Sequence, residues 1–143
     1  MKRILALIIC ATLIGVVNAQ VKTPAPSPSQ VVKQALGLSK IEVNYSRPGV
    51  KDREIFGKLV PFDKMWRTGA NGVTTIKVKS KVMFEGKELK KGTYAFLTIP
   101  GKDKWTIVVN SNTKNNAWAY DDATEVFRID VKPVTSTEKV ETF

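Results

Sequence analysis

The sequence of 143 residues contains no histidine, and its one cysteine, Cys10, lies close to the amino terminus. Without histidine, the chain cannot build a Ser-His-Asp or Cys-His nucleophile system or use imidazole as a general acid or base. Zinc sites made of cysteine and histidine are excluded as well. Catalysis would have to rely on carboxylates, lysine or tyrosine, so the composition favours a non-catalytic protein without a cofactor or a metal.

The sequence also lacks a hydrophobic run long enough to span a bilayer. Residues 4–17 form an apolar stretch of about 14 residues, whereas a membrane-spanning helix needs about 20. Lys2 and Arg3 precede this stretch, and the small residue Ala19 follows it. This pattern is typical of a secretory signal peptide over residues 1–19, cleaved after Ala19. It predicts a secreted or periplasmic protein with no transmembrane segment after cleavage.

Cleavage would remove Cys10, so no disulfide would stabilise the mature domain. The whole chain has 23 basic and 13 acidic residues, and loss of Lys2 and Arg3 leaves 21 against 13, a net charge of +8. Such a charge raises the question of nucleic acids and anionic surfaces. However, the lysines alternate with apolar residues, as in "IKVKSK", which is typical of a solvated sheet face. No nucleic-acid-binding motif is present, so we expect no nucleic acid partner.

Short alternating stretches predict β-strands throughout the chain after a Pro- and Ser-rich linker at residues 20–28. In "SKIEVNYS", for example, Ile41, Val43 and Tyr45 share one face. No segment of the mature chain has three turns of helical periodicity. The sequence therefore predicts an all-β domain at residues 29–143, an antiparallel β-sandwich of jelly-roll type. The expected strands lie within 30–37, 39–46, 73–80, 81–89, 92–100, 104–110 and 126–133, and another begins near residue 140.

One long connection, residues 46–71, interrupts the strands. Ile55, Phe56, Leu59 and Val60 recur at a spacing near four, which predicts a short helical turn that ends at Pro61. Connections of this length are usually functional or packed as ordered loops.

Three arginines, Arg47, Arg53 and Arg67, lie in or beside this loop, although lysine predominates elsewhere. Guanidinium groups form planar, two-pronged contacts, so the three side chains together could bind an anionic ligand. Alternatively, they hold the loop in place by bonding backbone carbonyls and nearby carboxylates. The candidate carboxylates are Asp52, Glu54 and Asp63.

The stretch "MWRTGAN" closes the loop and contains two further candidate binding residues, Trp66 and Asn71. Trp118 and Tyr120, in the polar loop at residues 111–125, are candidates as well. Together with Tyr45, Tyr94 and Trp105, these aromatic residues could line a groove for a sugar or a lipid, although aromatic residues on strands more often belong to the core. Gly69 permits a tight turn, so the stretch is either a binding site or a structural corner.

Asp121, Asp122 and Glu125 form the densest group of carboxylates. Paired carboxylates could bind calcium or act as the acid and base of a glycosidase. Acidic residues in loops are more commonly solvated.

Several motifs resemble those of the bacterial family called domain of unknown function 2911. They are "YSRPGVKDREIFGKLVPFDKMWRTGAN", "GTYAFLTIPGKDKWTIVVN" and "WAYD". The resemblance covers nearly all of the mature chain and implies a secreted or cell-envelope protein with a β-rich domain, but no known activity. Members of that family usually continue for a few more strands, so we expect either a domain truncated at its carboxyl terminus or a member that has lost an edge strand. The family motif corresponds to Tyr45, Arg47, Pro48, Arg53, Phe56, Gly57, Trp66, Arg67, Thr68, Gly69, Ala70 and Asn71.

Three functions remain open. The favoured one is a binding module for a small molecule, a glycan or an envelope protein. The alternatives are a hydrolase of glycans or cell wall that uses the loop carboxylates, and a structural envelope module without a ligand.

Overall fold

The computed structural model describes residues 23–114 and 120–143, so the predicted signal peptide, its cleavage site and Trp118 lie outside the described residues. Within these described residues, eight strands and one short 3-10 helix, η1, make up the regular structure. In the described part of the chain, no helix has the length and apolar character of a membrane span. The elements are β1 (Ser29–Leu36), β2 (Ser39–Ser46), β3 (Thr74–Val78), β4 (Val82–Phe84), β5 (Lys87–Leu89), β6 (Gly92–Ile99), β7 (Trp105–Asn110), η1 (Asp122–Thr124) and β8 (Glu125–Val131).

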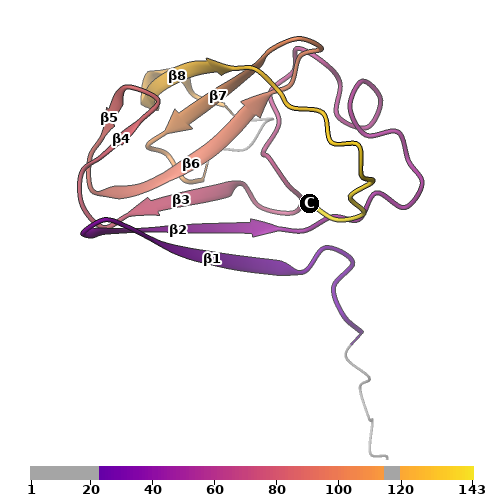
Figure 1. Cartoon of the computed structure of the whole chain (residues 1–143), viewed down its shortest axis with the longest axis horizontal. Helices are drawn as coiled ribbons and strands as arrows, with labels where there is room; N and C mark the ends of the chain where they lie inside the picture. The colour runs from indigo at the N-terminus through magenta and orange to yellow at the C-terminus, as the bar shows by residue number, and fades with distance from the viewer. Residues whose placement is uncertain (1–22, 115–119) are drawn as a thin grey trace, which may run out of the picture.

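Six strands form one antiparallel sheet in the order β1-β2-β3-β6-β7-β8, while β4 and β5 form a separate hairpin. The sheet is strongly twisted, and β1–β3 run in a different direction from β6–β8 (Figure 1). The all-β, antiparallel, sandwich-like fold predicted from the sequence is confirmed. The strand expected within residues 81–89 is a hairpin, in which a turn at Gly86 connects β4 to β5.

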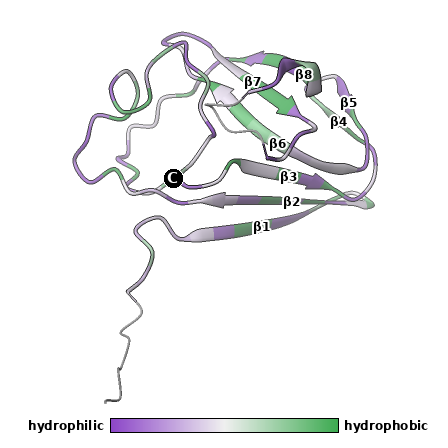
Figure 2. Ribbon diagram, turned by 180° about the vertical axis from the view of Figure 1, so that it is seen from behind, coloured by the Kyte–Doolittle hydropathy of each residue, from purple (hydrophilic) through white to green (hydrophobic). Residues whose placement is uncertain are grey.

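The core lies on both faces of the sheet, because β6 and β7 are central strands. Successive residues of a strand point to opposite faces, so neighbouring Val108 and Val109 belong to different hydrophobic clusters. Val109 packs with Val78, Val82 and Leu89, and the β4–β5 hairpin supplies the last two of these residues. Figure 2 shows hydrophobic residues along β6 and β7.

The second cluster connects the sheet to the long loop. Its buried members are Ala95, Leu97 and Val108, and Met65, near the end of the loop, packs against them. Tyr120, which precedes β8, packs there too. The loop is therefore fixed to the body of the domain.

The helical turn predicted for residues 55–60 is wrong. The segment forms a hydrogen-bonded turn in which the Val60 amide donates to the Ile55 carbonyl over 2.8 Å. Gly57 has a φ of +91°, which does not occur in a right-handed helix. A Cβ atom at this position would lie 2.8 Å from the Phe62 ring. Instead of a helix, the chain forms a turn in which the Phe62 ring packs closely on Gly57.

The strand expected near residue 140 appears as a single bridge between Thr142 and Gly49. The Phe143 amide donates to the Pro48 carbonyl over 3.2 Å, and the Val50 amide donates to the Glu141 carbonyl over 2.8 Å. The last residues therefore lie along the start of the long loop (Figure 1).

Candidate ligand-binding site

The "MWRTGAN" stretch is a structural corner anchored to β6. Trp66 and Thr98 exchange two backbone hydrogen bonds, of 2.7 and 3.0 Å. Thr68 is buried, and its hydroxyl lies 3.0 Å from that of Thr98. The Thr74 hydroxyl donates to the Thr68 carbonyl over 2.5 Å. These bonds hold the chain where the loop turns into β3.

Arg67 and Asn71 support the same corner. Arg67 Nη1 donates to the Asn71 carbonyl over 2.7 Å. The Asn71 side-chain amide donates to the Ser27 carbonyl over 3.1 Å and to Ser46 Oγ over 3.4 Å. Among the described residues, Arg67 has no carboxylate partner. One nitrogen of its guanidinium group therefore stabilises the turn, and its positive charge is not neutralised by an ion pair within the described domain.

Arg47 and Arg53 hold the loop through backbone oxygens and one hydroxyl group, not through side-chain carboxylates. Arg47 Nε donates to the Phe143 carbonyl over 3.0 Å, and Nη2 donates to Thr142 Oγ1 over 2.7 Å. Arg53 donates to the carbonyls of Val50 and Gly49 over 3.0 and 2.6 Å.

The predicted backbone contacts of the three arginines are thus confirmed. The predicted contacts with Asp52, Glu54 and Asp63 are wrong for the described residues, because Asp52 pairs with Lys139 instead, over 3.1 Å. Backbone carbonyls replace the carboxylates as partners since the loop leaves many of them outside the strand ladders.

Beneath the loop lies a cavity of about 880 Å³. Its walls come from Ser27, from the loop between Pro48 and Ala70, and from Val140, Thr142 and Phe143 near the carboxyl terminus. Most of the lining side chains are apolar, and this volume suits a small organic ligand. The apolar lining residues with larger side chains are Val50, Ile55, Phe56, Leu59, Val60, Met65, Trp66, Val140 and Phe143.

An aromatic row extends along this cavity. The ring centroids of Trp66 and Phe143 are 5.4 Å apart, and those of Trp66 and Phe56 are 5.9 Å apart. Tyr45 continues the row at 5.7 Å from Phe143, and Trp105 continues it at 4.9 Å from Phe56. All four pairs meet edge to face, the arrangement that the charge distribution of aromatic rings favours. Phe56, Trp66 and Phe143 of this row line the cavity and give it flat, polarisable walls.

The charged side chains that line the cavity are all positive. Arg53, Lys64 and Arg67 line the cavity, and no aspartate or glutamate does. These three cations form no ion pair with any described residue. An apolar space bordered by cations favours a ligand with an apolar body and an anionic group.

A second hollow of about 450 Å³ lies on the sheet face beside the first cavity. It is lined by residues without formal charge, including Val43, Ile76, Phe84 and Phe96. Phe143 lines both spaces, so its ring stands between them.

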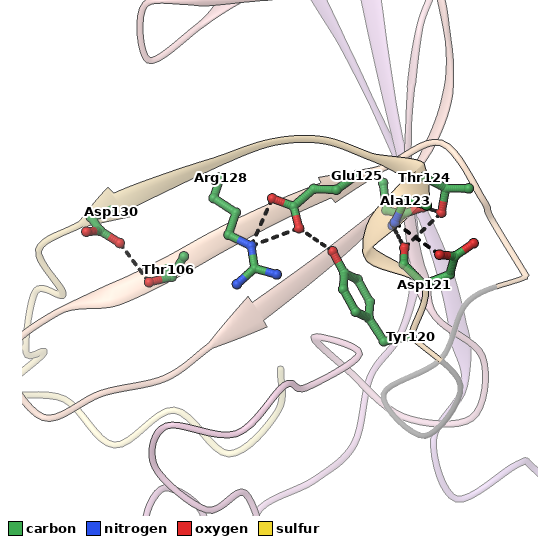
Figure 3. A network of polar contacts seen from close by, with 9 residues as sticks. Thr106, Tyr120, Asp121, Ala123, Thr124, Glu125, Arg128 and Asp130 are labelled. Carbon is green, nitrogen blue, oxygen red and sulfur yellow. Dashed lines mark hydrogen bonds and ion pairs between the residues drawn. The ribbon is translucent and has the colours of Figure 1, made fainter.

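Tyr120 does not line the cavity and takes part in a polar network at the start of β8 (Figure 3). Its hydroxyl donates to Glu125 Oε2, and Arg128 Nε lies 2.8 Å from both oxygens of the same carboxylate. Partial burial and the hydrogen bond to Glu125 raise the pKa of the Tyr120 phenol above its ordinary value. The hydrogen bond to Glu125 also raises the pKa of Arg128. This network fastens the start of β8.

The remaining carboxylates of this region have local roles or none. Asp121 Oδ1 accepts from the Ala123 amide over 3.0 Å and caps η1. Asp122 is exposed. No group of three or more possible metal-binding side chains occurs in residues 23–114 and 120–143. The geometry therefore provides no observation that favours calcium binding or an acid–base pair here.

The comparison with known families decides the relationship. The model of a family described as "Protein of unknown function (DUF2911)" matches residues 27–143. The chain belongs to this family. No curated protein and no solved structure matches the chain significantly.

The structure of this DUF2911 protein brings Arg53, Trp66 and Arg67 together at one cavity. Arg47 and Asn71 do not line this cavity, but they donate hydrogen bonds to residues that line it. Tyr120 lies elsewhere, and Trp118 lies outside the described residues.

Sequence reasoning missed most of the residues that line the cavity of this DUF2911 domain, including Phe56 as an aromatic wall, Lys64 and Phe143. Phe56 is part of the family motif, but its hydrophobic spacing pointed to a helix. Phe143 carries no local signal, because its partners Tyr45 and Trp66 are far away in the sequence.

Proposed function

We propose that this DUF2911 protein is a secreted or periplasmic binding module that does no chemistry. It holds a small ligand with an apolar, planar body and an anionic group in the cavity beneath the long loop. The observation that carries the proposal is the combination of the 880 Å³ aromatic cavity with a lining that contains Arg53, Lys64 and Arg67 but no acidic side chain.

The corner and the binding site are compatible roles of one stretch. The backbone of Trp66 pairs with Thr98, while its ring lies in the aromatic row. Arg67 uses one nitrogen, Nη1, to donate a hydrogen bond to the Asn71 carbonyl. A guanidinium group has five N–H donors, so further donors remain for a ligand.

A pair of fluorescent probes tests this proposal. 1-Anilinonaphthalene-8-sulfonate carries an aromatic body and a sulfonate, whereas N-phenyl-1-naphthylamine has the same hydrocarbon body without the charge. The variant Arg67→Ala should weaken binding of the sulfonate probe about tenfold, because a charge-assisted hydrogen bond contributes roughly 1.5 kcal/mol. Binding of the neutral probe should change little.

Lys132→Ala is the matched control, because Lys132 is an exposed cation outside the cavity lining. It should leave the affinity of both probes unchanged. Equal affinity of the folded Arg67→Ala variant for the sulfonate probe would exclude Arg67 from the site. A structural module without a ligand would bind neither probe measurably.

Export is tested separately. After expression with the complete amino terminus in a bacterial host, the protein should be recovered from the periplasm or the medium. Its intact mass should correspond to a chain that begins at Gln20. Recovery of the full-length chain in the cytoplasm would contradict this part of the proposal.

A further inference from the structure

Lysines gather at the end of the sheet where β1 turns into β2. Val78 of β3 pairs with Ile41 of β2 and also with the first residue of β6. Lys40, Lys79 and Lys91 are each one residue away from these three paired residues, towards the same end of the sheet. Neighbouring strands are about 4.8 Å apart, and the Lys79 amide donates to the Lys40 carbonyl over 3.1 Å. Three lysine positions from distant parts of the sequence thus lie side by side.

The charges at this end are exposed and unpaired. Lys40, Lys79, Lys90 and Lys91 are all exposed, and none of them forms an ion pair with a described residue. The nearby Lys81 differs, because it lies 3.3 Å from Glu88. Unpaired cations that share one surface add up to a strong local positive potential, although these lysines are scattered in the sequence.

Apolar side chains project from the same end. The β1–β2 connection consists of Gly37 and Leu38, and the Leu38 side chain is fully exposed, with a relative exposure of 109%. Leu36, the last residue of β1, is also 49% exposed. We call the surface formed by Lys40, Lys79, Lys90, Lys91, Leu36 and Leu38 the lysine-rich tip. Figure 1 shows the β1–β2 turn at the opposite end of the sheet from the long loop.

We propose that the lysine-rich tip docks the protein on a bilayer surface that contains anionic lipids. Lysines near such a surface contribute about 1 kcal/mol each at low salt. An apolar side chain that enters the interface adds the free energy of its burial. Leu38 distinguishes a bilayer from other polyanions, because a projecting leucine contributes nothing to contacts with phosphates alone. The proposal does not depend on a ligand in the cavity.

Co-sedimentation with lipid vesicles tests the proposal. One set of vesicles consists of phosphatidylcholine, and the other contains equal parts of phosphatidylcholine and phosphatidylglycerol. The protein should sediment with the anionic vesicles and not with the neutral ones. Lys79→Gln should weaken the association about fivefold, as expected for the loss of about 1 kcal/mol. Leu38→Ser should weaken it by about the same factor.

Leu38 and Lys79 are exposed, so both variants should keep the melting temperature of the unchanged protein. Lys132→Gln is the control, because Lys132 is exposed and follows β8 rather than lying at the tip. It should bind the anionic vesicles as the unchanged protein does. Equal sedimentation with both kinds of vesicle would overturn the proposal. So would full binding by Leu38→Ser, which would indicate a surface for polyanions such as nucleic acid.

Discussion

Thr68, Gly69 and Asn71 all have positive φ values, of 56°, 146° and 60°. Such values are rare for a β-branched residue like threonine and cost roughly 1–3 kcal/mol when the surroundings enforce them. At Thr68 the surroundings are the hydroxyl groups of Thr74 and Thr98, which bond its carbonyl and its side chain. The corner therefore stores strain that its hydrogen bonds offset.

Gly69 should be the residue of this corner least tolerant of a side chain. A Cβ atom there would lie 3.1 Å from the Ser46 carbonyl oxygen and 3.3 Å from Thr74 Oγ1. We expect Gly69→Ala to lower the free energy of unfolding by about 2 kcal/mol, from the unfavourable φ and this close contact. Gly72→Ala is the control, because no atom lies within 4 Å of its added Cβ. Urea denaturation would measure both, and equal effects would contradict the account of the corner.

Tyr120 gives the domain a sensitivity to alkaline pH. Burial and Glu125 raise the pKa of its phenol in the folded protein, so the folded state holds this proton more tightly than the unfolded chain does. The resulting stability is present in full below about pH 10 and is lost as the pH rises towards the folded pKa. Between about pH 9 and pH 11, the melting temperature should fall more for the unchanged protein than for Tyr120→Phe. If the melting temperatures of the two proteins fell equally with pH, this role of Tyr120 would be contradicted.

At the scale of elements, the long loop is stabilised by the carboxyl-terminal segment. Arg47 bonds the Phe143 carbonyl and the Thr142 hydroxyl, and the bridge between Thr142 and Gly49 adds backbone contacts. Because both segments line the cavity, the shape of the cavity depends on their association.

Arg47→Ala should loosen this association without unfolding the sheet. We expect the Phe143 amide, which donates to Pro48, to exchange its hydrogen about tenfold faster, since the loss of one such contact costs roughly 1.5 kcal/mol. Amides of β2 and β3 should keep their protection. Arg53→Ala, which removes contacts within the loop alone, should leave the Phe143 amide unchanged. Equal exchange at Phe143 in all three proteins would show that Arg47 does not hold the segment.

The strands could be predicted from the sequence, whereas the cavity could not. The alternation of Ile41, Val43 and Tyr45 is a local signal of one half-buried face, and β2 has the predicted bounds Ser39–Ser46. The bond between Arg47 and Phe143 joins residues 96 positions apart and leaves no periodic trace. The family motif identified several residues of the corner, yet it could not show whether their side chains meet at a cavity.

At the scale of the whole molecule, two different surfaces occupy opposite ends of the sheet. The long loop and the carboxyl-terminal segment border the cavity at one end, and the lysine-rich tip forms the other (Figure 1). A protein docked on a bilayer through the tip would hold the cavity away from the lipid. This arrangement leaves the cavity accessible to a ligand that diffuses in the surrounding water.

The location of a bound anionic probe tests the proposed ligand-binding role of the cavity most directly. A nitrogen–proton correlation spectrum would be recorded during titration with 1-anilinonaphthalene-8-sulfonate, and the Trp66 indole signal would be assigned with a Trp66→Phe variant. We predict that the largest shifts occur at the Trp66 indole N–H and at the backbone amides of residues 64–70 and 142–143. Largest shifts at β1 or at the lysine-rich tip, with an unchanged Trp66 signal, would contradict binding in the cavity.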